Sequence, residues 1–182
     1  MLRIKIPERE YFDERTERFG TIKATTLYLE HSLISISKWE AAWHIPFFDG
    51  DKTNEQTLDY IRCMILNREI DDDDKPFYVN LLSADDIKKI NDYISDPMTA
   101  TSITDNGEHG RNQKVTSELI YCWMVQFNIP AEFEKWHINR LIMLIRVCGE
   151  ENKPKKKMSR KEIMAQNKAL NAARKARLNT RG

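Results

Sequence analysis

The chain has 182 residues, which fits one compact domain of roughly 100–150 residues with an appendage. No stretch approaches the roughly 20 apolar residues of a membrane span, and the start lacks the apolar run of a signal peptide, so we expect a cytoplasmic protein with no membrane partner. Charge is uneven. Residues 151–182 hold eleven of the 29 Lys/Arg and two of the 28 Asp/Glu, a net charge of +9 against −8 for the remainder. An acidic body with a basic tail indicates a macromolecular partner.

The first thirty residues predict two β-strands. Leu2, Ile4 and Ile6 alternate with charged residues, and a second alternation runs over 22–28. The charged stretch between them, about residues 7–20, is predicted to be a long hairpin connection. Two strands alone are marginally stable in water, so we expect them to pack on the helices or to pair with another chain.

From Ser32 the apolar period becomes helical. A first helix is predicted from Ser32 to Pro46, and capping boxes at Thr53–Gln56 and Ser83–Asp86 predict two more. The run Asp71–Asp74 is interpreted as an exposed acidic turn, because it lacks the spacing of a calcium loop. One face of the first helix carries the apolar side chains of Leu33, Ile36, Trp39, Ala42 and Trp43.

Residues 97–114 contain few apolar side chains and are predicted to form a mobile loop. Thr116 or Ser117 should cap an apolar helix, and another helix should run from about Pro130 to Cys148, ended by Gly149. A basic helix is predicted from Arg160 to Leu178 after a capping box at Ser159 and Glu162; its apolar stripe is too thin to hold it on a core.

These elements predict a mainly α fold, a bundle of about five helices with an N-terminal β-hairpin and a basic C-terminal helical tail. The predicted organisation has three parts. They are the hairpin over residues 1–30, packed on the helices, the helical core over 31–149, and the linker with its partly disordered helix over 150–182.

No catalytic, cofactor or metal site is predicted. The three cysteines are 59 and 26 residues apart in sequence, without the close Cys/His spacing of a zinc site. His137 is interpreted as a structural residue, and a pairing with Cys122 has no local support as a nucleophile. No phosphate-binding glycine motif is present. We therefore expect a protein that is not an enzyme and has no cofactor.

The basic tail is the main candidate for a binding segment. It could contact nucleic-acid phosphates or an acidic protein surface, although it has no aromatic residue for base stacking. Three other interpretations remain. The tail could be solvated and have no partner, it could fold back on the acidic body, or it could reach a neighbouring copy of the chain. The residues assigned to it are Lys155, Lys156, Lys157, Arg160, Lys161, Arg174, Lys175 and Arg177.

Several segments resemble the tail assembly chaperones of long-tailed bacteriophages. They are TLYLEHSLISISKWEAAWHIPF, KTNEQTLDYIRCM, MTATSIT, TSELIYCWMVQFNIPAEFEKWHINRLIMLIRVC and the ending KKMSRKEIMAQNKALNAARKARLNTRG. The similar region spans about residues 26–182, and the segments follow the order expected for that family. The blocks around Trp39–Trp43 and around Cys122–His137 are its most distinctive parts.

The resemblance implies a role in virion assembly in the host cytoplasm. Such late proteins bind the long helical tape measure protein, promote polymerisation of the tail tube protein around it, and are absent from the finished particle. The family has no catalytic residues to transfer. A second interpretation is a nucleic-acid-binding accessory protein that acts through its tail, and a third is a minor structural protein of the tail.

A chaperone of this kind needs an apolar surface for an amphipathic client helix. The face of Leu33, Ile36, Trp39 and Trp43 is one candidate wall for such a groove, although residues at this spacing usually face the core. The basic tail would then attract acidic client segments. Self-association is an additional expectation for the N-terminal strands.

Overall fold

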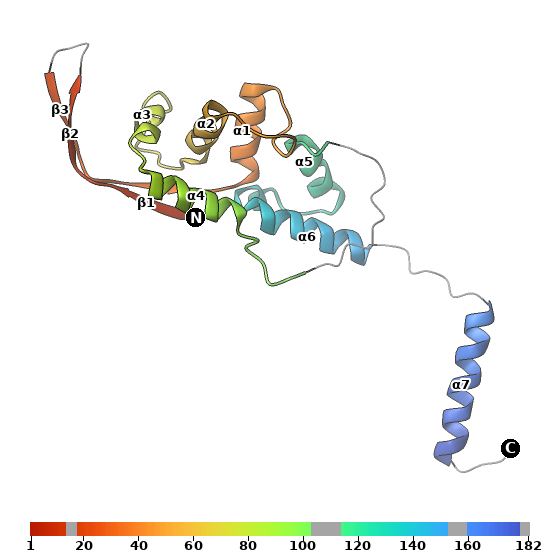
Figure 1. The fold of residues 1–182 in the computed structure, drawn as a ribbon. Coiled ribbons are helices and arrows are strands. Elements are labelled where there is room, and N and C mark those ends of the chain that lie inside the picture. Colours follow the sequence, from red (N-terminus) through yellow and green to blue (C-terminus); the bar gives the residue numbers. More distant parts are fainter. Residues whose placement is uncertain (14–17, 103–113, 153–159, 179–182) are drawn as a thin grey trace. The chain divides into compact units, whose positions relative to one another are not determined.

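The computed structural model describes residues 1–13, 18–102, 114–152 and 160–178. It is mainly helical, with antiparallel strand pairs at its N-terminus (Figure 1). The chain divides into two compact units, Met1–Glu150 and Glu151–Gly182, and each is described here by itself. No helix in the described ranges has the length and apolar content to cross a membrane.

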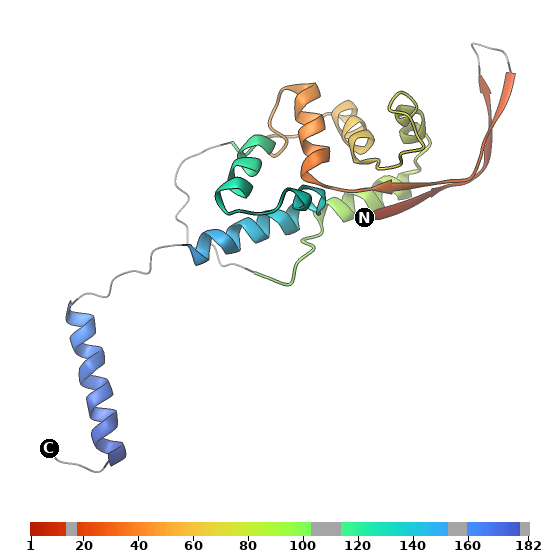
Figure 2. The same cartoon turned by 180° about the vertical axis from the view of Figure 1, so that it is seen from behind.

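The N-terminal strands form one long antiparallel ladder. Strand β1 (Leu2–Ile6) pairs with β4 (Thr25–Leu29), and β2 (Arg9–Asp13) pairs with β3 (Arg18–Ile22) in the same register. The prediction of a loop over residues 7–20 is therefore wrong. This stretch is charged and lacks the apolar alternation that reveals a strand, so its pairing follows from the neighbouring ladder instead. In both views β2 and β3 extend away from the helices (Figures 1 and 2).

The other edge of β4 is covered by residues 64–67. The Leu66 amide donates to the Tyr28 carbonyl at 2.8 Å. The Asn67 side chain then acts as a further strand residue, because its Oδ1 accepts from the Tyr28 amide at 2.8 Å and its Nδ2 donates to the Thr26 carbonyl at 3.0 Å. Together with helix α4 (Ala84–Ser95), which packs on β1, these bonds fix the β1–β4 pair in the body.

Four helices follow, α1 (Leu33–Trp43), α2 (Asn54–Met64), α3 (Lys75–Asn80) and α4 (Ala84–Ser95). The capping boxes predicted for α2 and α4 are confirmed, with Thr53 and Ser83 at the N-cap positions, and Ser32 caps α1. Helix α3 was not predicted. The turn of Asp71–Asp74 leads directly into it, and Pro76 lies in its first turn, where a missing amide hydrogen is harmless.

The helix predicted from Pro130 to Cys148 is instead two elements. Residues Ala131–Lys135 form the 3-10 helix η1, and α6 spans Ile138–Glu151, so Gly149 does not end it. The break has a clear cause. The Ile138 amide donates to the His31 carbonyl at 2.7 Å, a long-range bond that replaces a bond within a continuous helix. Helix α5 (Ser117–Gln126) precedes them, capped by Thr116.

Helix α5 is attached to α1 through the buried carboxylate of Glu40. Its Oε1 accepts from the Phe47 amide and its Oε2 from the Ser117 amide, both at 2.7 Å. One α1 side chain therefore holds the loop after α1 and the first residue of α5. The carboxylate also satisfies an amide at a helix N-terminus, which has no partner within its own helix.

We expect Glu40→Gln to lower the free energy of unfolding by about 2–3 kcal/mol, because the new amide group can accept from one backbone amide but presents a donor to the other. Chemical denaturation measures this change. The control is Glu132→Gln, at an exposed position of η1. Equal stability of the two variants would contradict the bridging role of Glu40.

Candidate functional site: an apolar groove between α5 and α6

Helices α5 and α6 enclose an open apolar groove of about 490 Å³. This volume lies within the ~300–1,000 Å³ typical of ligand pockets. The two helices lie side by side in both views of the fold (Figures 1 and 2). The groove is lined by Phe48, Val115, Trp123, Gln126, Phe127, Ile142, Ile145, Arg146 and Gly149.

The α5 wall exists because this helix has two apolar faces. Ile120 and Met124 are buried in the core. Trp123 and Phe127, which are four residues apart, share a neighbouring face and remain half-buried at the groove. A helix that buries one apolar face and leaves a second partly exposed can receive a partner on the second face.

The end of α5 positions the ring of Phe127. Asn128 adopts a left-handed conformation with φ 53°, and the Ile129 amide bonds back to the Met124 carbonyl at 2.8 Å. This turn reverses the chain directly after Phe127. Gly149 of α6 lies opposite, where an added Cβ would be 3.8 Å from the ring atom Cζ of Phe127. The absence of a side chain at Gly149 thus leaves the ring edge open to the groove.

The polar groups of the groove are few. Among its lining residues only Gln126 and Arg146 carry polar side chains, and Arg146 is exposed. Phe48, which also lines the groove, is 41% exposed. An apolar surface with one cation at its edge suits a segment that presents several apolar side chains and one carboxylate, and it offers no arrangement for bond-breaking chemistry.

The predicted groove wall on α1 is wrong for three of its four residues. Leu33, Ile36 and Trp39 each have 0% exposure, because α2 and α5 pack against this face. The Trp39 indole Nε1 also donates to the Gln56 carbonyl at 2.9 Å, which ties α1 to α2. These residues are therefore core, and only Trp43 is accessible.

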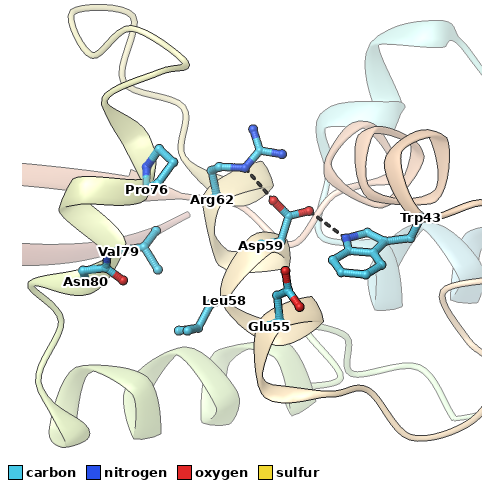
Figure 3. Close-up of a pocket in the computed structure, with 8 residues that line it drawn as sticks. All are labelled: Trp43, Glu55, Leu58, Asp59, Arg62, Pro76, Val79 and Asn80. Atoms are coloured by element: carbon cyan, nitrogen blue, oxygen red, sulfur yellow. Dashed lines mark hydrogen bonds and ion pairs between the residues drawn. The ribbon is translucent and has the colours of Figure 1, made fainter.

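Trp43 lines a second, smaller pocket of about 240 Å³ between α1, α2 and α3 (Figure 3). Its indole Nε1 donates to Asp59 Oδ2 at 2.9 Å, and Arg62 Nε donates to Asp59 Oδ1 at 2.6 Å. The carboxylate is thus shared between two donors, and the bond to Arg62 raises the pKa of that guanidinium. The pocket is smaller than most ligand sites, so we treat the α5–α6 groove as the principal candidate.

The basic tail residues fall into two groups. Lys155, Lys156 and Lys157 lie outside the described residues. Arg160, Lys161, Arg174, Lys175 and Arg177 lie on α7 (Arg160–Leu178), and all five are exposed. Helix α7 belongs to the second unit of the chain.

Two other predictions fall at least partly outside the described residues. They are Ser159 of the predicted capping box and most of the predicted loop over residues 97–114.

A largely buried polar cluster joins the residues after β4 to α2, α4 and the start of α6. His31 Nδ1 is hydrogen-bonded to the Tyr60 hydroxyl, and the Tyr93 hydroxyl donates to Glu30 Oε1 at 2.6 Å. His137 Nε2 lies 3.0 Å from the Tyr93 carbonyl, and its Nδ1 accepts from the Asn139 amide at 3.3 Å. Both ring nitrogens of His137 are therefore engaged, which fits the structural role predicted for it.

The two histidine rings of this cluster are in edge contact, with centroids 4.9 Å apart. Burial and the neighbouring His137 lower the pKa of His31 to about 3. Burial also lowers the pKa of His137. Within the described ranges no group of three or more His, Cys, Asp or Glu side chains is arranged to hold a metal ion.

Most of the groove residues were not recognised from sequence. The sequence placed Trp123 and Phe127 on an apolar helix but did not indicate which face of it they occupy. It suggested no role for Phe48, Val115 or Ile142. One signal was present. Leu119, Ile120, Trp123, Met124 and Phe127 span an arc of about 140° around α5, which is wider than the roughly 100° of a narrow core-facing stripe.

Comparison of the chain with protein-family models, with curated proteins and with solved structures gives no match.

We expect acid to destabilise the protein through His31. In the unfolded chain this group binds a proton near pH 6.5, whereas the folded protein resists protonation down to about pH 3. The unfolded state therefore binds more protons as the pH falls through this window, and the free energy of unfolding should fall by up to about 1.4 kcal/mol per pH unit. Denaturation at pH 7.5, 6.5 and 5.5 measures this slope.

His31→Asn should reduce the slope, because the asparagine keeps an acceptor for Tyr60 without a basic nitrogen. The control is His44→Asn, at an exposed position whose φ of 57° asparagine tolerates. An NMR titration of the His31 ring with a pKa near 6.5 would disprove the burial effect.

Proposed function

We propose that the chain is a non-enzymatic tail assembly chaperone of a long-tailed bacteriophage, which binds the tape measure protein and promotes tail tube assembly. The single observation that supports this best is the open apolar groove between α5 and α6. The family resemblance over residues 26–182 supplies the identity of the client, and the groove supplies a surface on which such a client can be held.

The lining of the groove indicates which kind of client segment it would bind. A tape measure protein is a long amphipathic helix whose apolar stripe has no cover until the tube closes around it. A groove lined by Trp123, Phe127 and Ile142 can receive such a stripe in the helix-in-groove mode. Aromatic side chains contribute large contact areas with few rotatable bonds, so they are effective anchors. Arg146 at the rim would pair with a client carboxylate.

The second unit completes this proposal. We infer a bundle that holds the client and a basic tail that attracts it, because oppositely charged groups accelerate encounter more than they increase affinity. The proposed place of action is the host cytoplasm, before the tail is complete. The projecting β2–β3 ribbon is the element we associate with self-association, since two-stranded ribbons away from a core are marginal alone.

A second candidate function is supported by α7. This helix carries six Lys/Arg and one Glu, and its described side chains are exposed, as phosphate contacts require. A nucleic-acid-binding accessory protein would use these residues. A third candidate, a minor structural protein of the tail, would be found in purified particles.

The chaperone proposal is tested by co-purification with a tape measure fragment. Ile142→Glu places a charge in the groove and should reduce binding at least about tenfold, since a buried unpaired charge opposes association. The control, Val125→Glu, makes the same kind of change at a 77% exposed position of α5 outside the groove lining. Both variants should keep the circular dichroism spectrum of the unaltered chain. Equal capture of the client by both would disprove the groove as its site.

The second candidate makes a different prediction. Retention of duplex DNA should fall steeply with salt, because each phosphate contact releases counterions, and it should vanish on deletion of residues 151–182. We expect weak retention at low salt and none near 0.2 M. Retention that persists at that concentration would favour the nucleic-acid function over the chaperone.

A further inference from the structure

Three lysines form a straight line along α7. Lys161, Lys168 and Lys175 are each separated by seven residues, which brings successive side chains within about 20° of one another around an α-helix and about 10.5 Å apart along it. All three are exposed. The remaining cations of this helix, Arg160, Arg174 and Arg177, lie about 80° or more around the helix from the line.

The face beside the lysine line has no bulky side chains. Ala165, Ala169, Ala172 and Ala176 follow one another at intervals of four, three and four residues, the spacing of a seam between two helices. The lysines then occupy the flanking position of each heptad, where charged side chains select the partner helix. The small alanine side chains would allow a partner helix to approach α7 closely, and the lysine line would select a partner helix with complementary negative charges.

We propose that this face of α7 binds an α-helix that carries a carboxylate at every seventh residue. This inference rests on the proposed function, because it gives the charge pattern of the client segment that the tail captures. Charge complementarity determines which partner helix we propose. Three lysines at a constant spacing match three carboxylates at the same spacing on the partner, whether the two helices run parallel or antiparallel.

Two other occupants fit this face less well. A second copy of α7 in the antiparallel direction would place the lysine line against itself, and in the parallel direction it would offer only Gln166 and Ala173 opposite the lysines. A nucleic acid would respond to the total charge of the helix, whichever face carries it, and α7 has no aromatic side chain to stack on a base.

The experiment compares two variants of the full chain that lose the same charge. The first replaces the line, Lys161→Gln, Lys168→Gln and Lys175→Gln. The second replaces the other cations, Arg160→Gln, Arg174→Gln and Arg177→Gln. The probe is a labelled synthetic helix of about three heptads with glutamate at every seventh residue, and a peptide of equal composition with permuted glutamates is its control. Fluorescence anisotropy at low salt measures binding, and circular dichroism checks that both variants keep their helicity.

We expect the lysine variant to bind the heptad peptide about fivefold to tenfold more weakly than the unaltered chain, as the loss of three exposed ion pairs implies. The arginine variant should lose less than about twofold, and the permuted peptide should bind weakly to every form. Equal losses in the two variants, or equal binding of the two peptides, would overturn the proposal. Binding of duplex DNA in place of the heptad peptide would overturn it as well.

The same variants separate this inference from the proposed function. If the lysine variant still captures a tape measure fragment while Ile142→Glu does not, the lysine line is not a docking face and the groove remains the client site. If neither change affects capture, the groove and the lysine line both fail as client sites. If the unaltered chain captures no tape measure fragment while it still binds the heptad peptide, the proposed function fails and the charge pattern recognised by α7 remains.

Discussion

The arrangement of the body depends on the buried carboxylate of Glu40. Its two oxygens each accept from a backbone amide at 2.7 Å, one in the loop after α1 and the other at the first residue of α5. A charged acceptor suits both amides, because it satisfies donors that have no partner in their own segment. With α5 fixed in this orientation, Ile120 and Met124 turn into the core, and Trp123 and Phe127 turn toward α6. The groove is thus a consequence of how α5 is anchored.

Local signals were sufficient for the starts of four helices. Ser32, Thr53, Ser83 and Thr116 each cap a helix with a side chain that accepts a backbone amide a few residues later, and this information lies within a few positions of sequence. What the sequence did not reveal depends on distant partners. The break before Ile138 needs the His31 carbonyl, and β2 and β3 need the register set by β1 and β4. Helix α3 is too short to show a period.

The site was harder to predict than the fold, because core and surface use the same side chains here. Trp39 and Trp123 both follow the helical period, yet Trp39 is fully buried against α2 and Trp123 borders the groove. Which of two apolar faces stays open is decided by the neighbouring helix. Residues such as Gly149 and Ile142 acquire their role only once α6 lies beside α5. The basic helix α7 differs from the groove in this respect. The positions of its charged residues follow from the sequence and the helical period alone, without a packing partner.

A protein that holds a client only until assembly must bind quickly and release readily. An apolar groove open to solvent can bind an amphipathic helix, but a site of this size leaves most of a long client uncovered, so each contact remains reversible. A lysine line contributes mainly to the rate of encounter and is weakened by salt, because its charges are exposed. In the proposed function the two features would therefore act at different steps, the charged line in capture and the apolar groove in retention. In the proposed function, growth of the tube would compete for the same apolar stripe and displace the chain without any chemical step.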